Sequence, residues 1–123
     1  MEYIATDKAP GAIGPYSQAV AVGDMIFTSG QIAINPATGN VEAEDIKAQT
    51  EQVCQNLKAV LEAAGSSLEK VVKTTCFLSD MDNFAAFNEV YGKYFTTKPA
   101  RSCVAVKTLP KNVLVEVDTV AVK

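Results

Sequence analysis

The chain has 123 residues, of which 48% are hydrophobic and 20% charged, so its length and composition predict a single globular domain over residues 1–123. A net charge of −3 and the scatter of the lysines along the sequence disfavour nonspecific binding to RNA or DNA. There is no histidine, which excludes the Ser-His and Cys-His nucleophile arrangements and most metal sites. Any chemistry must therefore use carboxylates, hydroxyls, backbone groups and water.

The N-terminus and the cysteines are typical of a cytoplasmic protein. Residues 1–8 contain no basic segment followed by an apolar one, so no export signal is expected. Cys54, Cys76 and Cys103 are odd in number and widely spaced, which fits neither a disulfide framework nor a zinc site. We expect three free thiols, a cytoplasmic location and no membrane span.

The N-terminal part predicts short strands joined by ordered loops. After a short strand at 3–5, residues 9–15 contain two prolines and two glycines, and this loop leads to Tyr16. Segments 17–22 and 25–29 flank a Gly-Asp pair, which predicts a tight β-hairpin because glycine adopts the positive φ that such turns need.

The middle of the chain predicts two amphipathic helices separated by a strand. Residues 45–64 carry apolar side chains at intervals of three and four, and Gly65 ends this helix. Residues 71–78 are apolar and β-rich, and Asp80 or Asp82 can cap the second helix. That helix carries an aromatic stripe: Phe84, Phe87, Tyr91 and Tyr94.

Two further strands are predicted at 101–106 and 113–122. Arg101 is the only arginine, and its planar fork can grip a carboxylate at two points. Glu116 lies among valines in the last strand, where a carboxylate needs a reason to be present. The alternatives are that Arg101 is a surface or salt-bridging residue and that Glu116 is solvated.

The order of elements predicts an α+β fold with a single mixed six-stranded sheet and both helices on one of its faces. Both faces of the predicted sheet are apolar, and no segment is left to cover the second face. We therefore expect this face to pack against other copies of the chain. The alternative is an ordinary sheet with some exposed valines.

Side chains alternate along a strand, so Arg101 and Cys103 should share one side. No histidine can activate Cys103, which favours a packing or ligand-lining role over nucleophilic catalysis. If the last two strands form a hairpin, Val106 faces Val113 and Cys103 lies opposite Glu116.

Four separated motifs are found in order along the chain: Ala-Pro-Gly-Ala-Ile-Gly-Pro-Tyr-Ser-Gln at 9–18, Phe-Thr-Ser-Gly-Gln-Ile at 27–32, Phe-Asn-Glu-Val-Tyr at 87–91, and Pro-Ala-Arg-Ser-Cys-Val at 99–104 with Val-Glu-Val at 115–117. Through them nearly the whole chain resembles the RidA/YjgF family of imine deaminases. The resemblance implies a chorismate-mutase-like fold and a homotrimer whose sheets form a central barrel, with ligand clefts between subunits. It also implies that the last strand inserts between earlier strands, which replaces the hairpin register.

Family members hydrolyse 2-imino acids and their enamine tautomers, such as 2-aminoacrylate, to 2-keto acids and ammonia. By resemblance, Arg101 grips the substrate carboxylate and Glu116 orients the attacking water. The resemblance assigns further ligand contacts and supporting positions to Tyr16, Ser29, Gly30, Asn88 and Cys103. Imines hydrolyse readily, so positioning and one carboxylate suffice, and neither a cofactor nor a metal is implied.

Other functions within the family stay open. One is a 2-keto acid binding or regulatory protein, and another is an endoribonuclease or translation inhibitor, which an acidic chain without histidine supports less well. The segment 94–99 looks shorter than in enteric bacterial members, and Lys98 replaces an aromatic residue, so the pocket rim is expected to differ.

Overall fold

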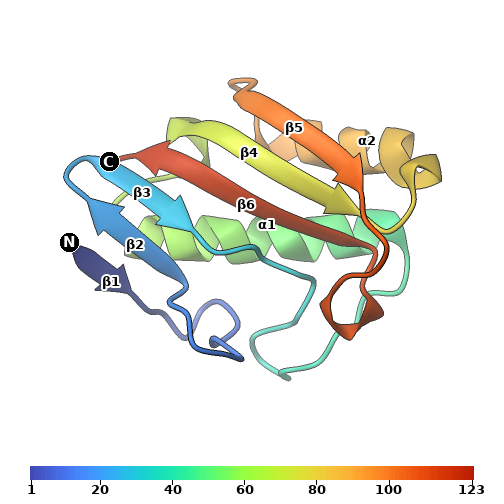
Figure 1. The fold of residues 1–123 in the computed structure, drawn as a ribbon, viewed down its shortest axis with the longest axis horizontal. Coiled ribbons are helices and arrows are strands. Elements are labelled where there is room, and N and C mark those ends of the chain that lie inside the picture. Colours follow the sequence, from blue (N-terminus) through green and yellow to red (C-terminus); the bar gives the residue numbers. More distant parts are fainter.

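The computed structural model describes residues 1–123 and contains one six-stranded mixed sheet with two helices behind it (Figure 1). The strands are β1 (Glu2–Ile4), β2 (Ala19–Val22), β3 (Met25–Thr28), β4 (Val71–Leu78), β5 (Ala100–Ala105) and β6 (Val115–Val122), and the helices are α1 (Ile46–Ala63) and α2 (Phe84–Tyr94). The predicted fold class is confirmed. No helix has the length and apolar character needed to cross a lipid bilayer.

The sheet order is β1-β2-β3-β6-β4-β5, and β4 and β5 form its only parallel pair. The hairpin register for the last two strands is wrong, because β6 lies between β3 and β4. Glu116 pairs with Phe77, and Cys103 pairs with Cys76. In this position β6 hydrogen-bonds to a neighbour along both of its edges. The insertion implied by the family resemblance is confirmed.

Local chemistry accounts for the predicted hairpin. Val22 pairs with Met25 across the turn, and Gly23 has φ of +58°, a value that glycine adopts without steric cost. The two strands are one or two residues shorter than the prediction, because Ser17 and Ser29 leave the ladder near the pocket described below.

Helix α1 begins and ends as the sequence predicts. Asp45 caps it by accepting a hydrogen bond from the Ala48 N–H at 2.7 Å. Gly65, with φ of +83°, ends it in a Schellman motif in which the Ser66 N–H donates to Leu61 O at 2.8 Å. Helix α2 begins differently from the prediction, because Asp80 caps the short 3-10 helix before it and not α2 itself.

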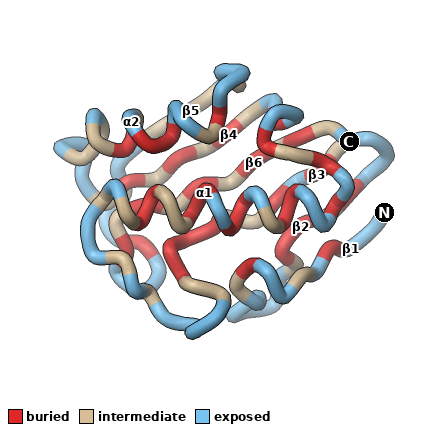
Figure 2. Tube along the Cα trace, turned by 180° about the vertical axis from the view of Figure 1, so that it is seen from behind, coloured by how far each residue is buried: buried red, intermediate tan, exposed pale blue.

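The core lies between the sheet and the helices. Along β6 the side chains alternate, and Val115, Val117 and Ala121 are fully buried against the helix layer. Buried residues also recur along α1, as seen from the helix side (Figure 2). No element covers the opposite face of the sheet, where Phe27 and Val104 remain 46% and 48% exposed.

Candidate functional site

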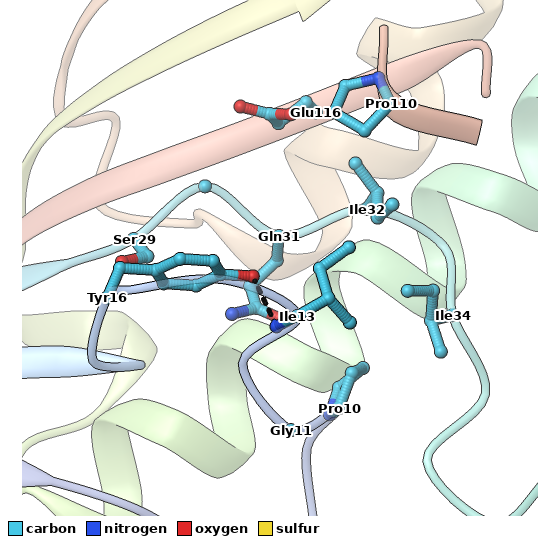
Figure 3. Close-up of a pocket in the computed structure, with 11 residues that line it drawn as sticks. Pro10, Gly11, Ile13, Tyr16, Ser29, Gln31, Ile32, Ile34, Pro110 and Glu116 are labelled. Carbon is cyan, nitrogen blue, oxygen red and sulfur yellow. Dashed lines mark hydrogen bonds between the residues drawn. The ribbon is translucent and has the colours of Figure 1, made fainter. Parts of the chain in front are cut away.

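A cavity of about 350 Å³ opens where β3 ends beside the start of β6. Three segments line it: the loop that precedes β2, residues 29–34 after β3, and Pro110 with Glu116 (Figure 3). The only carboxylate that lines the cavity is that of Glu116, and much of the remaining wall is apolar, formed by Ile13, Ile32 and Ile34. The arrangement combines an apolar wall with one ionisable group, as in many small-molecule sites.

Glu116 projects from the face of β6 that the helices do not cover. It is half-buried, and burial together with the nearby Asp118 carboxylate raises the pKa of Glu116 above its usual range. Its carboxylate lies against the backbone of Gly30: a Cβ at Gly30 would be 2.8 Å from Cδ of Glu116 and closer still to Oε2. Glycine is therefore required at this position if Glu116 is to keep its place.

Ser29 and Tyr16 lie on the opposite side of the same cavity. The Ser29 hydroxyl donates to Ser17 O at 2.6 Å, which leaves its oxygen lone pairs available to a ligand. The Tyr16 hydroxyl accepts a hydrogen bond from the Ile13 N–H at 3.3 Å, drawn as a dashed line in Figure 3. This contact folds the aromatic ring back over its own loop at the cavity.

A buried amide holds that loop in place. Gln18 is 4% exposed, accepts a hydrogen bond from the Thr6 N–H at 2.7 Å and donates to Pro10 O at 2.7 Å. Gln18 stands in one of the family motifs, but the resemblance predicts no role for it, and the sequence predicts no apolar wall. A glutamine that follows a proline-glycine loop was the available signal, since such loops need partners for their free carbonyls.

Arg101 and Cys103 share one side of β5, as predicted, and this is the helix side. Their partners on β4, Thr74 and Cys76, are fully buried beneath the helices. The Arg101 guanidinium donates to Asn88 Oδ1 at 2.7 Å. Its central carbon lies 4.9 Å from the centre of the Tyr91 ring and 5.4 Å from that of Phe84.

Arg101 has no carboxylate partner in the chain. The single ion pair joins Lys47 and Glu89 on the helix surface, so a salt-bridging role for Arg101 finds no support within one copy. The Arg101 guanidinium donates one hydrogen bond, to Asn88, and packs against the rings of Phe84 and Tyr91. Its other N–H groups remain available to bind an anion.

Cys103 is poorly suited to nucleophilic catalysis. Burial raises the pKa of its thiol, although the nearby Arg101 lowers it in part. All three cysteines are free thiols in the structure, as predicted. Cys103 packs partly against the main core, which agrees with a packing or lining role.

The predicted site residues fall into two groups. Tyr16, Ser29, Gly30 and Glu116 meet at the cavity beside β6, whereas Asn88, Arg101 and Cys103 lie on the helix side of β5. Arg101 and Glu116 project from opposite faces of one sheet, with β4 between their strands. One copy of the chain therefore does not bring the guanidinium to the carboxylate.

Comparisons with known proteins give the family. The family model described as Endoribonuclease L-PSP matches residues 6–123. A RutC family protein of Pyrococcus abyssi is 54% identical over 99% of this chain and 97% of its own length. The 2-iminobutanoate/2-iminopropanoate deaminase of Escherichia coli K12 is 52% identical over 98% of this chain and 96% of its own length.

Solved structures agree with these sequence relatives. E. coli TdcF with bound serine superposes with a TM-score of 0.95 at 45% identity and covers 100% of this chain and 99% of its own. RidA from an Antarctic Psychrobacter superposes with a TM-score of 0.96 at 45% identity and full coverage of both chains. The motifs, the fold and these matches agree, and the chain belongs to the Endoribonuclease L-PSP family, which is the RidA/YjgF family that its sequence resembles.

Proposed function

We propose that this protein hydrolyses small 2-imino acids, and the enamines that tautomerise to them, to 2-keto acids and ammonia. The observation that carries the proposal is the half-buried Glu116 carboxylate, held over Gly30 beside Ser29 in a largely apolar cavity. Relatives about 52% identical over nearly the whole chain are named 2-iminobutanoate/2-iminopropanoate deaminases, which supports the same reaction class.

In the proposed reaction, water adds to the imine carbon, and the resulting carbinolamine loses ammonia to leave the keto acid. Glu116 accepts a proton from the attacking water and passes it to the imine nitrogen, which gives the carbinolamine. It then takes the hydroxyl proton of the carbinolamine and delivers it to the amino nitrogen, so that the C=O bond forms as the C–N bond breaks and ammonia leaves. In each step Glu116 acts first as a base and then as an acid. Its raised pKa suits this double role, because a carboxyl group with an ordinary pKa returns a proton less readily near neutral pH.

Arg101 binds the substrate carboxylate in this proposal, and Asn88 holds the guanidinium in position. Ser29, the Gly30 backbone and the backbone at Cys103 contribute hydrogen bonds to the ligand, and Tyr16 closes the cavity. No covalent intermediate is needed, because imine hydrolysis is intrinsically easy and positioning of water and substrate supplies the acceleration.

The two residue groups meet only if a second copy contributes one of them. We propose a homotrimer in which the uncovered sheet faces pack together. The edge strand β5 of one subunit then lies beside its neighbour, so that Arg101 reaches around this edge to the cavity that holds the neighbour's Glu116. The exposed Phe27 and Val104 on that face support burial against another apolar surface. Light scattering should report about three times 13.1 kDa, and a monomer at micromolar concentration would contradict both the assembly and the shared site.

A complementation experiment tests the shared site directly. Arg101→Ala and Glu116→Gln should each abolish most activity, and co-refolding equal amounts should restore about a quarter of the wild-type activity, because one interface in four then pairs two intact residues. If both residues act within one subunit, every site in the mixture keeps one defect, and no activity returns.

In the deaminase assay, an amino-acid oxidase generates the imino acid in situ and its hydrolysis is followed over time. A carbonyl reagent traps the imino acid that has not been hydrolysed. Keto acid release that is not accelerated by the protein would refute the proposed reaction. Arg101→Lys keeps the charge but loses the bidentate fork, and it should lower kcat/KM by roughly tenfold to a hundredfold, equal to about 1.4 to 2.7 kcal/mol.

The second candidate function is binding of 2-keto or amino acids without turnover. E. coli TdcF, 45% identical to this chain, was solved with bound serine, which favours a ligand-binding role for that protein. Calorimetry that shows 2-oxobutanoate binding, together with an unchanged rate of imine hydrolysis, would favour this candidate. The family model bears the name endoribonuclease, but the net charge of −3 gives no attraction for the RNA backbone.

A further inference from the structure

The apolar wall of the cavity is formed by the irregular segment 32–34, which has few hydrogen bonds within itself. After β3, Ile32 and Ile34 point into the cavity while Ala33, fully buried, belongs to the main core. The Ile34 N–H donates to Ile32 O at 2.8 Å, which closes a three-residue γ-turn. A single γ-turn is a weak local structure, so other contacts must fix the direction of the two isoleucines.

The packing behind the wall is small. Ile32 and Ile34 belong to a separate cluster of four buried residues, with Leu109 and Val113, and not to the main core of 22. A cluster of this size constrains its members less than the main core does, because each member has few buried neighbours. On one flank the segment is attached to β6 through Gln31, whose N–H donates to Val117 O at 2.8 Å.

The other attachment is a buried amide in the middle of α1. Asn56 is 1% exposed, and its Nδ2 donates to Ile32 O at 3.0 Å and to Ile34 O at 2.9 Å. Its Oδ1 accepts a hydrogen bond from Gln52 Nε2 at 2.9 Å. Every polar atom of the side chain is used, and a flipped amide would set its oxygen against two carbonyls. The two carbonyls and the Gln52 donor therefore fix the orientation of Asn56 together.

We propose that Asn56 is a positioning residue that sets the size of substrate side chain the cavity accepts. It ties both ends of the γ-turn to α1, so the wall cannot retreat to admit a larger group, and the cavity of about 350 Å³ keeps its width. The identity of the substrate in this inference rests on the proposed function, whereas the role of the wall does not. Asn56 itself does not line the cavity, so it acts through the wall residues.

The test compares two substrates of different size in two variants and a control. Asn56→Asp keeps the side-chain shape and the acceptor for Gln52 but retains at most one of the two donated hydrogen bonds, because a carboxyl group carries at most one proton. Gln52→Met removes only the donor to Oδ1 of Asn56 and leaves the two bonds to the wall without that support. Thr50→Val is the control, because the buried Thr50 hydroxyl donates to Ile46 O within α1 and makes no hydrogen bond to the wall.

The readout is the ratio of kcat/KM for the imino acid derived from alanine to that derived from leucine. This ratio should fall about three- to tenfold in Asn56→Asp and about twofold in Gln52→Met. These changes are part of the selectivity that a rigid apolar pocket has against substrates with additional methylene groups. The ratio should not change in Thr50→Val. Hydrogen exchange of the Ile34 amide should also become faster in the first two variants and not in the control.

An equal fall of kcat/KM for both substrates would overturn the proposal, because a purely structural role does not change selectivity. If Asn56→Asp does not fold, an unchanged ratio in Gln52→Met overturns it instead. If the wild type hydrolyses no imino acid, the proposed function fails, and the wall is then tested by calorimetry with 2-oxopropanoate and 4-methyl-2-oxopentanoate. An unchanged ratio of the two Kd values in the variants would then refute the role of Asn56.

Discussion

The Glu116 carboxylate lies where a side chain at Gly30 would stand, and Gly30→Ala perturbs this arrangement with a single methyl group. A Cβ at Gly30 would lie 2.8 Å from Cδ and 3.0 Å from Cγ of Glu116, distances at which the carboxylate must move. Gly30 does not have a positive φ, so alanine fits the backbone there. The substitution therefore displaces the carboxylate without straining the main chain.

The expected effects on activity and stability differ. A displacement of about 1 Å at a reacting group can cost on the order of a hundredfold in rate, so kcat/KM should fall between tenfold and a hundredfold. Stability should change by no more than about 1 kcal/mol, because a gain of about 0.4 to 1 kcal/mol from the less flexible unfolded chain offsets a Glu116 rotamer cost of about 0.5 to 1.5 kcal/mol.

A double-mutant cycle with Glu116→Asp isolates the contact. Glu116→Asp shortens the side chain and lowers activity by itself, but it also makes room for the new methyl group. Gly30→Ala should therefore cost much less in the Glu116→Asp background than in the wild type, as measured by the oxidase-coupled assay and urea unfolding. Equal losses in both backgrounds, or full activity in Gly30→Ala, would show that the position of the carboxylate over Gly30 does not matter for turnover.

Three further outcomes are expected. Because the pKa of Glu116 is raised, its ionisation favours the unfolded chain, so stability should fall as the pH rises from the usual glutamate range through the raised pKa. Urea unfolding of Glu116→Gln should show a smaller decline, since only Asp118, whose pKa is also raised by burial, still contributes there. Asn88→Ala should free the Arg101 guanidinium and lower kcat/KM by about three- to tenfold with a small change in Tm, and unaltered kinetics would separate Asn88 from substrate binding. Gly65→Ala, at φ of +83°, should lower the free energy of unfolding by about 1 to 2 kcal/mol in urea titrations and leave the kcat/KM of the folded protein unchanged.

The features that sequence alone determined are local ones. The hairpin follows from Gly23, and helix α1 follows from its apolar period, the Asp45 cap and Gly65, because each depends on residues a few positions apart. The shared side of Arg101 and Cys103 follows from strand alternation in the same way. The family could also be identified from the sequence, because its motifs are contiguous stretches of residues.

Only the tertiary structure decided which face each strand presents to the helices. Alternation places Arg101 and Cys103 together but does not say whether they point toward α2 or away from it, since that depends on pairing with β4. The insertion of β6 between β3 and β4 joins segments far apart in sequence, and no local pattern encodes it. The partners of Asn56 are backbone carbonyls of a segment more than twenty residues away, and every residue type offers the same carbonyl, so sequence carries no signal for these contacts.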